Sequence, residues 1–208
     1  MFLDNLAEKN KLILCGIAAP ILFIMNIVIW GGLTPEYDHL RQYVSELGAM
    51  EAPFALLMNW LGIIPFGGLI CIFSLGYFVT SADNVSRWLT APCLFLTGVG
   101  FTLAGIYACD AGCSFIDMSI SGIIHNLSAF SAFALAILTV CLALISQIKK
   151  KNNRRLLSLN LLFLVAMIVS FTGLIYLGPD YEYVGVVQRG FLLPFCLWLF
   201  FIGTELLE

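Results

Sequence analysis

Charged residues are scarce in this chain, and their scarcity excludes most soluble folds. Only 11% of its 208 residues are Asp, Glu, Lys or Arg, whereas 61% are hydrophobic. A soluble domain is typically about a quarter charged and about half apolar. The mean hydropathy of +0.97 points the same way, so we expect lipid to surround most of the chain. The net charge of −3 argues against nucleic acid as a partner, because such a partner requires a basic surface.

The chain also lacks the common signatures of catalysis and of cofactor binding. It contains no GxSxG, HExxH, P-loop or CxxCH motif. It has only two His residues, so the site of the membrane hydrolases that use three His ligands for zinc cannot be complete in its usual form. The sequence therefore demands no cofactor, although two His residues can in principle ligate one haem or help to hold one Zn²⁺.

Six apolar runs are each long enough to cross a bilayer, which takes roughly 20 mostly apolar residues in a helix. We predict spans over residues 12–33, 54–79, 88–109, 121–147, 156–178 and 186–206. The first run is too long for the apolar part of a signal peptide, and no small-x-small cleavage site follows it. We therefore expect an all-α bundle of six transmembrane helices, forming a single integral membrane domain over residues 1–208.

The basic residues predict how this bundle is oriented. Eight of the ten Lys and Arg residues lie before the first span or in the second and fourth connections: Lys9, Lys11, Arg87, Lys149, Lys150, Lys151, Arg154 and Arg155. The positive-inside rule places these segments, and both termini, in the cytoplasm. Arg41 and Arg189 fall on the other side with both His residues and most carboxylates. We therefore expect any chemistry at the extracytoplasmic face.

The connection after the first span, residues 34–53, is the longest on that face. At 100° per residue, the polar side chains between Tyr37 and Gly48 fall within an arc of roughly 160°, and the apolar ones fall opposite. The polar set is Asp38, His39, Arg41, Gln42, Ser45 and Glu46. This pattern predicts a short amphipathic helix that lies in the membrane interface. The alternative for each polar residue is an ordinary solvated face.

His125 and Asp110 are the sharpest candidates for chemistry. His125 lies near the outer start of the fourth span, and a His inside a span is costly unless it faces a polar cavity or a partner. The alternatives are a buried His that donates to a backbone carbonyl, or a His hydrated by headgroups. Asp110, after the third span, could orient His125 as a general base, ligate a metal with His125 and His39, or only form a turn.

Two further features of the outer face have both structural and functional interpretations. Cys109 and Cys113 are the only two of seven Cys residues outside the predicted span interiors. They could form a disulfide that staples the loop, although their close spacing could prevent it, and a redox role is the alternative. Arg189 begins the last span, where it could anchor the interface or hold a phosphate or carboxylate headgroup.

Several stretches resemble one known family, the domain of unknown function 998 family. YDHLRQYVSELG at 37–48 is similar to that family's Y-S-H-x-R-x-x-I-S-E-L-G stretch. YACDAGC at 107–113, followed by His125-Asn126, resembles its F-P-x-D-x-G-C and H-N stretches, with Ala111 where the family often has Pro. Gln188-Arg189 also resembles the family. The resemblance covers nearly the whole chain and implies a six-span protein of the bacterial cytoplasmic (inner) membrane, without implying an activity.

The resemblance also suggests one constellation of outer residues, namely His39, Arg41, Ser45, Glu46, Asp110, His125 and Arg189. In the first hypothesis it belongs to a membrane hydrolase or transferase that acts on a lipid or lipid-linked headgroup. His125 would be the general base, Asp110 or Glu46 would orient it, and Arg189, with Arg41 and His39, would bind the headgroup. Ser45 completes the predicted catalytic set.

Two alternatives belong to other functional classes. A small-solute transporter would use a broken helix, for which Pro65-Phe-Gly-Gly68 is a candidate, but no charge lies at mid-span. A non-catalytic subunit or lipid-binding partner protein would pack through small residues such as Gly98, Gly100 and Gly105. Membrane lipid is an expected partner in every case, and a protein partner or a homo-oligomer is open.

Overall fold

The computed structural model describes residues 6–116, 118–149, 154–178 and 181–207, and all regular structure in them is helical. Six helical spans in this part of the chain are long and apolar enough to cross a membrane, which confirms the predicted fold class. They are α1 (Leu6–Leu33), α2 (Ala55–Leu57) continued through η2 (Met58–Ile63) and α3 (Ile64–Thr80), η3 (Ser86–Thr90) continued as α4 (Ala91–Ile106), α5 (Ile120–Lys149), α6 (Arg154–Leu177) and α7 (Val184–Leu207).

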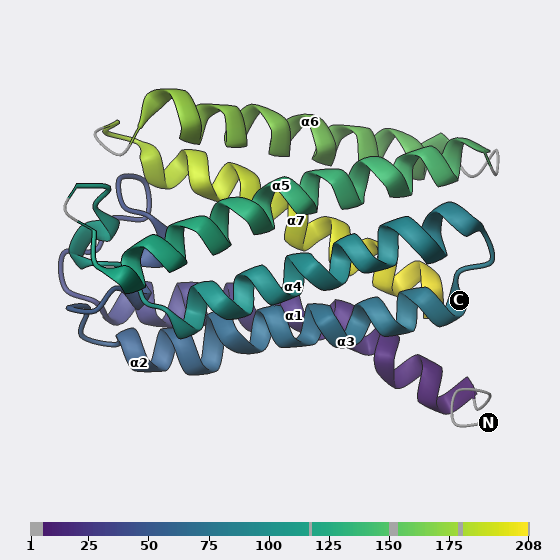
Figure 1. Ribbon diagram of the computed structural model, residues 1–208, viewed down its shortest axis with the longest axis horizontal. Helices are drawn as coiled ribbons and strands as arrows, with labels where there is room; N and C mark the ends of the chain where they lie inside the picture. Colours follow the sequence, from purple (N-terminus) through teal and green to yellow (C-terminus); the bar gives the residue numbers. More distant parts are fainter. Residues whose placement is uncertain (1–5, 117, 150–153, 179–180, 208) are drawn as a thin grey trace.

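The six spans form a closed ring in chain order. Each span packs against the next, and α7 returns to pack against α1. Because the described residues hold an even number of spans, α1 begins and α7 ends at the same end of the bundle (Figure 1). We call the opposite end, which holds the connections after α1, α4 and α6, the outer end. Lys150 and Lys151 of the predicted cytoplasmic basic cluster lie outside the described residues.

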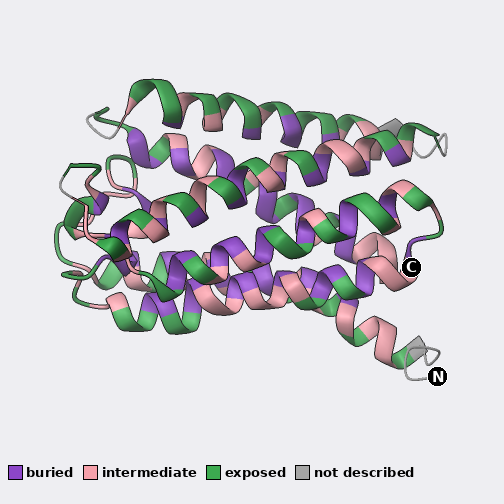
Figure 2. Cartoon of the chain, viewed as in Figure 1, coloured by how far each residue is buried: buried purple, intermediate pink, exposed green. Residues whose placement is uncertain are grey.

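Phenylalanine side chains fill the centre of the ring. One from each span takes part: Phe23, Phe66, Phe101, Phe133, Phe171 and Phe191. Their successive ring centroids lie 4.3–6.3 Å apart, the range in which aromatic pairs attract. The outward faces are also apolar, with Trp60, Trp88 and Val169 more than half exposed, as expected of helices surrounded by lipid (Figure 2).

Two prolines explain the π-helical turns η2 and η3. Pro65 and Pro92 each lie at the second residue of the α-helix that follows. A proline lacks an N–H and its ring clashes with the carbonyl four residues earlier, and a π turn relieves that clash. Four residues before Pro65 lies Leu61, whose carbonyl instead accepts a hydrogen bond from Asn26 Nδ2 at 3.1 Å. The predicted break at Pro65 is thus a π turn within a continuous span.

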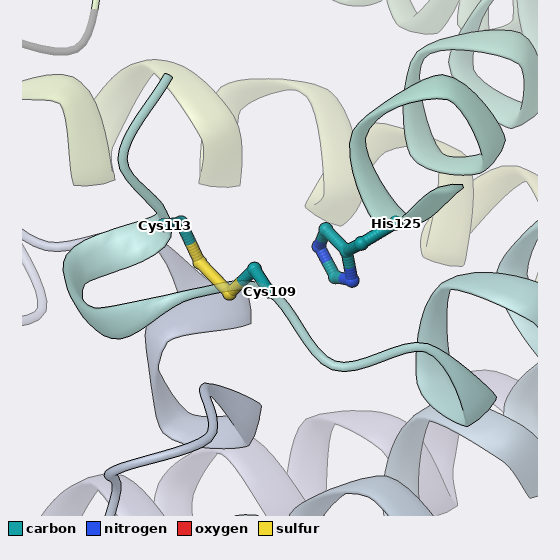
Figure 3. A group of neighbouring side chains, drawn as sticks. All are labelled: Cys109, Cys113 and His125. Atoms are coloured by element: carbon teal, nitrogen blue, oxygen red, sulfur yellow. A yellow bond between two sulfur atoms is a disulfide. The ribbon is translucent and has the colours of Figure 1, made fainter. Parts of the chain in front are cut away.

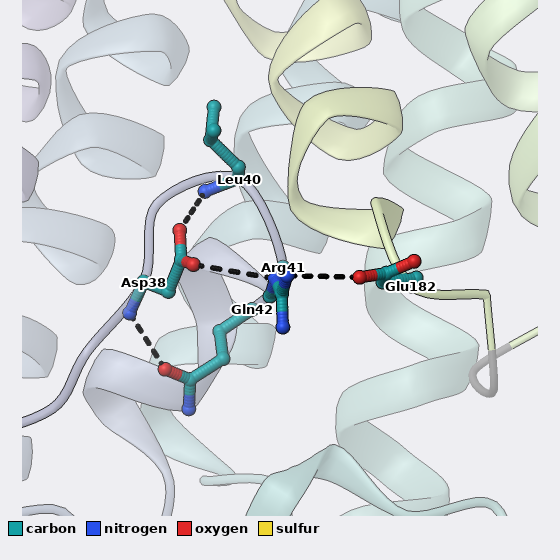
Figure 4. Close-up of polar contacts among 5 residues, drawn as sticks. All are labelled: Asp38, Leu40, Arg41, Gln42 and Glu182. Atoms are coloured by element: carbon teal, nitrogen blue, oxygen red, sulfur yellow. Dashed lines mark hydrogen bonds and ion pairs between the residues drawn. The ribbon is translucent and has the colours of Figure 1, made fainter.

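The predicted amphipathic helix over 37–48 is wrong in its extent and type. Only Val44–Gly48 is helical, as the 3₁₀ helix η1, and the residues before it form turns. Side chains compete for the backbone there: Asp38 Oδ1 accepts the N–H of Leu40, and Gln42 Oε1 accepts the N–H of Asp38, both at 2.8 Å (Figure 4). These bonds hold the backbone in turns instead of a helical ladder.

Glycines allow the spans to approach closely, as the small-residue pattern predicted. A Cβ on Gly67 of α3 would lie 2.5 Å from the Gly98 carbonyl oxygen and from the Thr102 nitrogen of α4, so the two backbones are in contact. Gly100 and Gly105 of α4 are also tight, because a Cβ there would lie 2.8 Å from Ala132 of α5 and 2.7 Å from Ile64 of α3. The packing role predicted for Gly98, Gly100 and Gly105 is confirmed.

Gly67 and its neighbour Gly68 form a matched pair for testing this contact. A Cβ on Gly68 meets nothing within 4 Å. We expect Gly67→Ala to lower stability by about 1–3 kcal/mol, because α3 and α4 must move apart. Gly68→Ala should be neutral or slightly stabilising, since alanine favours a helix. Thermal unfolding of both variants in the same detergent measures the difference, and equal melting temperatures would contradict the packing described.

Candidate functional site

Arg189, in the second turn of α7, ties the outer segment (residues 34–54) to the bundle. Its Nη1 donates to the carbonyls of Gln42 at 2.9 Å and Gly185 at 3.1 Å. Its Nη2 donates to the Tyr37 hydroxyl at 2.6 Å and lies 3.1 Å from Nδ1 of His39. Among the described residues, no carboxylate forms an ion pair with Arg189. The groups that contact its two Nη atoms are therefore all neutral, and the carboxylate of Glu46 acts on Arg189 only through a longer-range charge interaction.

The first turns of α7 are shaped to receive the outer segment. Gly185 lies directly against carbonyl oxygens of that segment, and a Cβ at this position would collide with them. The N–H of Val186 donates to the carbonyl of Leu40 at 3.0 Å. The side chain of Gln188 accepts the N–H of Val44 at 2.6 Å. Together these contacts fix the position of the segment before any ligand is considered.

An apolar groove of about 280 Å³ runs between α1 and α7 below this attachment. Its lining is apolar except at the outer end, where His39 and Arg189 lie; the apolar residues are Phe23, Ile24, Ile27, Val28, Leu192, Leu193 and Cys196. Val28 and Leu193 are 62% and 45% exposed, so the groove opens on the surface that faces lipid. The result is a lateral groove with a cationic end.

Burial and the charge of Arg189 favour the neutral form of His39. Burial lowers its pKa from the ordinary value of 6.5, the positive charge of Arg189 lowers it further, and Asp38 opposes both effects. Because Arg189 donates to Nδ1, the neutral ring carries its proton on Nε2. His39 also lies against Gly31 of α1, where a larger residue would displace the ring.

Glu46 and Arg41 have structural partners. Glu46 Oε1 accepts the N–H of Tyr43 at 2.7 Å, and Oε2 accepts Nε2 of Gln42 at 2.9 Å. Burial raises the pKa of this carboxyl, and both hydrogen bonds and the positive charge of Arg189 oppose the rise. The exposed Arg41 pairs with Glu182 at 2.8 Å, which links the outer segment to the connection before α7 (Figure 4). Neither side chain is bonded to His125.

His125 is buried, with 4% of its surface exposed, and its Nδ1 lies 2.7 Å from the Ala104 carbonyl and 3.0 Å from the Tyr107 carbonyl. Nδ1 therefore carries the proton and Nε2 carries the lone pair. Of the alternatives that the sequence left open for His125, this geometry is that of a buried His whose ring N–H donates to backbone carbonyls. Asp110 accepts the N–H of Ser119 at 3.0 Å, at the start of α5, and is not bonded to the imidazole.

Cys109 and Cys113 form a disulfide beside His125, as the sequence allowed (Figure 3). The hydroxyl of Ser45 lies 3.3 Å from Cys113 Sγ, so the disulfide also contacts η1. A cavity of about 60 Å³ is lined by Ser45, Cys113 and His125, together with Gln188 and mostly apolar side chains. Phe23 and Leu192 line both this cavity and the groove that holds His39 and Arg189, but no polar residue lines both.

Four of the seven residues in the predicted constellation thus form two pairs, and Arg41, Glu46 and Asp110 line neither cavity. Arg189 and His39 lie together at the groove, whereas His125 and Ser45 lie together at the disulfide. Within the described ranges, one group of His, Cys, Asp or Glu residues could hold a metal, and it does not combine His39 or Asp110 with His125. Sequence reasoning gave no role to Tyr37 or Gln188, because their partners lie about 150 residues away along the chain.

A polar cluster at the other end of the bundle was also not predicted from the sequence. The Tyr77 hydroxyl, Ser86 Oγ, Ser146 Oγ and Asp83 Oδ2 form a chain with successive distances of 3.4, 2.9 and 2.9 Å. It borders a cavity of about 240 Å³. Its hydroxyl residues lie singly on different spans, so no motif in the sequence predicts that they are in contact.

Six membrane-spanning helices, with a structured segment folded over one end, define a polytopic integral membrane protein. Residues 17–205 match the family model described as "Protein of unknown function (DUF998)". The match covers most of the chain, so the chain belongs to this family, as the resemblance indicated. No match was found among curated proteins or among solved structures.

The lowered pKa of His39 predicts a pH dependence of folding. As the pH falls below 6.5, the unfolded chain takes up the proton before the folded protein does, so stability decreases. His39→Gln keeps an acceptor for Arg189 but cannot be protonated, and we expect it to flatten this decrease. Melting temperatures in detergent from about pH 7.5 to about pH 5 measure the effect.

Glu46→Gln is the matched control, because the raised pKa of Glu46 has the opposite sign. The protonated carboxyl stabilises the folded protein at low pH. This contribution is lost as the pH rises from the ordinary pKa of 4.5 through the raised pKa of the folded state. Removing it should therefore steepen the decrease toward low pH. Identical pH profiles for His39→Gln and the unchanged protein would contradict the partly buried, neutral state assigned to His39.

Proposed function

We propose that this protein binds an anionic lipid or lipid-linked headgroup at the outer leaflet of a bacterial cytoplasmic membrane. The acyl chain occupies the groove between α1 and α7, and the headgroup meets Arg189 and His39. One observation carries this proposal: the groove is apolar along its length and ends at an arginine that has no carboxylate partner among the described residues.

The charge of Arg189 supports an anionic ligand. An arginine at the membrane interface is stabilised by an anionic group beside it. A lipid in the groove would place its headgroup next to Arg189. The contacts described for its two Nη atoms are all to protein groups, which leaves Nε–H of Arg189 and Nε2–H of His39 to donate to the headgroup. Because the guanidinium is already fixed, it loses little conformational entropy on binding.

The headgroup, and not the acyl chain, determines selectivity in this proposal. A chain that moves from the bilayer into an apolar groove exchanges one apolar environment for another, so it gains little from the hydrophobic effect. A hydrogen bond to a charged group contributes about 1.5–3 kcal/mol, or roughly tenfold to a hundredfold in affinity. Discrimination between headgroups therefore depends on Arg189 and His39.

The predicted orientation assigns this groove to the outer leaflet. Lys9, Lys11, Arg87 and Lys149 belong to the basic segments at the other end of the bundle, which the positive-inside rule places in the cytoplasm. The groove's cationic end then faces the extracytoplasmic interface, where headgroups are.

Binding is better supported than catalysis by the predicted residues. Asp110 and Glu46 accept backbone N–H groups and are not bonded to His125, so a carboxylate-oriented general base is not assembled. The carbonyls of Ala104 and Tyr107 orient the imidazole instead. Transport has less support, because the Pro65 region is a continuous π turn and not an unwound binding segment.

Lipid titrations of the detergent-purified protein, followed by native mass spectrometry, test this function. We expect phosphatidylglycerol to bind at least about tenfold more tightly than phosphatidylcholine, because only its headgroup carries a net negative charge. Arg189→Gln should remove this preference. Arg41→Gln is the matched control, since Arg41 lies at the same end of the bundle but is exposed and already paired with Glu182.

A second variant tests the groove without touching Arg189. Leu193→Trp should fill the groove and weaken both lipids, whereas Leu197→Trp, equally exposed on α7 but not lining the groove, should not. Equal binding of the two lipids by the unchanged protein, or an unaltered preference in Arg189→Gln, would refute the proposed function.

A further inference from the structure

The disulfide and His125 form a compact group that the lipid groove does not use. Cys109 and Cys113 come from the connection after α4, and His125 comes from the second turn of α5 (Figure 3). In the described part of the chain, their ligand atoms form the one set of three or more His, Cys, Asp or Glu groups that lie within 4.8 Å of one another and could hold a metal ion. All three residues are buried.

We propose that reduction of this disulfide converts Cys109, Cys113 and His125 into a binding site for one Zn²⁺ ion. Zn²⁺ prefers thiolate and imidazole ligands in tetrahedral geometry. Two thiolates balance the charge of the ion, so the occupied site is neutral. Neutrality matters here, because an unbalanced charge in a buried, apolar place is costly.

His125 already has the orientation of a metal ligand. In metal sites the ligating His almost always donates its second ring N–H to a carbonyl or carboxylate, which fixes the tautomer and the ring. Nδ1 of His125 is bonded in this way to the carbonyls of Ala104 and Tyr107. Figure 3 shows the other ring nitrogen on the side of the disulfide. Its lone pair is therefore available in the direction of the two sulfurs.

The backbone of the loop also favours chelation. Gly112 and Cys113 have φ angles of +63° and +47°, in the left-handed region. The chain thereby turns back sharply, and the Cα atoms of the two cysteines lie 5.0 Å apart. In a tetrahedral site with Zn–S bonds of about 2.3 Å, the two sulfurs lie about 3.8 Å apart. Side-chain rotation after reduction can provide that separation.

The cavity beside the group leaves room for a fourth ligand. It has a volume of about 60 Å³, and Ser45, Cys113 and His125 all contribute to its lining. A water molecule occupies about 30 Å³ in the liquid. A water in this cavity, or the hydroxyl of Ser45, can complete the tetrahedron. Three protein ligands and one exchangeable position are also the arrangement of catalytic zinc sites.

The two states exclude each other by their chemistry. A dithiol reductant transfers two electrons and two protons to the disulfide, which yields two thiols and leaves the reductant oxidised to its own disulfide. Zn²⁺ then displaces one proton from each thiol as the Zn–S bonds form. In the oxidised state neither sulfur is a thiolate, so it offers no such ligand. The loop is thus stapled either by the disulfide or by the metal.

Metal titration of the full-length protein in detergent tests this inference, with Co²⁺ as a spectroscopic probe for Zn²⁺. The protein is compared as purified in its oxidised form and after anaerobic reduction by a dithiol that is then removed. We expect one Co²⁺ per reduced chain, with a thiolate-to-cobalt charge-transfer band that Zn²⁺ abolishes. The oxidised protein should show no such band. Reduced protein without the band would overturn the proposal.

Variants assign the site to these residues. His125→Asn keeps an amide N–H for the two carbonyls but lacks Nε2, and we expect at least about tenfold weaker binding. Cys109→Ser combined with Cys113→Ser should abolish the band, and this pair decides the matter if the His125 variant does not fold. Cys71→Ser combined with Cys141→Ser is the matched control and should bind as the unchanged protein does. A band that survives loss of Cys109 and Cys113, or disappears in the control, would overturn the proposal.

Discussion

The outer end of this protein depends on the contacts of Arg189 with the outer segment. Hydrogen bonds from one guanidinium to Gln42 and Tyr37, with His39 against Nη2, fix a segment that has only five helical residues of its own. The same contacts leave the charge of Arg189 at the end of an apolar groove, without an ion-paired carboxylate among the described residues. A structural anchor thereby becomes a candidate binding group, which explains why the fold and the proposed function share one residue.

Lipid is the physical constraint that made the fold predictable. A helix that crosses a bilayer must be long and apolar, and lysine and arginine must stay mainly on one side, so composition and spacing alone indicated six spans. Each span is found within a few residues of its predicted range. The same argument failed for the segment over 37–48, because side chains such as Asp38 and Gln42 compete with the backbone there and periodicity does not capture that competition.

The candidate site was less predictable, since it depends on contacts between distant parts of the chain. Residue type identified Arg189, His39 and His125 as unusual, and the spacing of Cys109 and Cys113 allowed a disulfide that the structure contains. Nothing in the sequence indicated that His39 and His125 would line different cavities. Nor did it indicate that backbone carbonyls, and not Asp110 or Glu46, would orient His125.

An experimental structure in lipid nanodiscs that contain phosphatidylglycerol tests the central claim most directly. The account predicts headgroup density within hydrogen-bonding distance of Arg189 and His39, with acyl density along the groove between α1 and α7. A groove closed by side chains, or an Arg189 paired with a protein carboxylate while the lipid lies elsewhere, would contradict it.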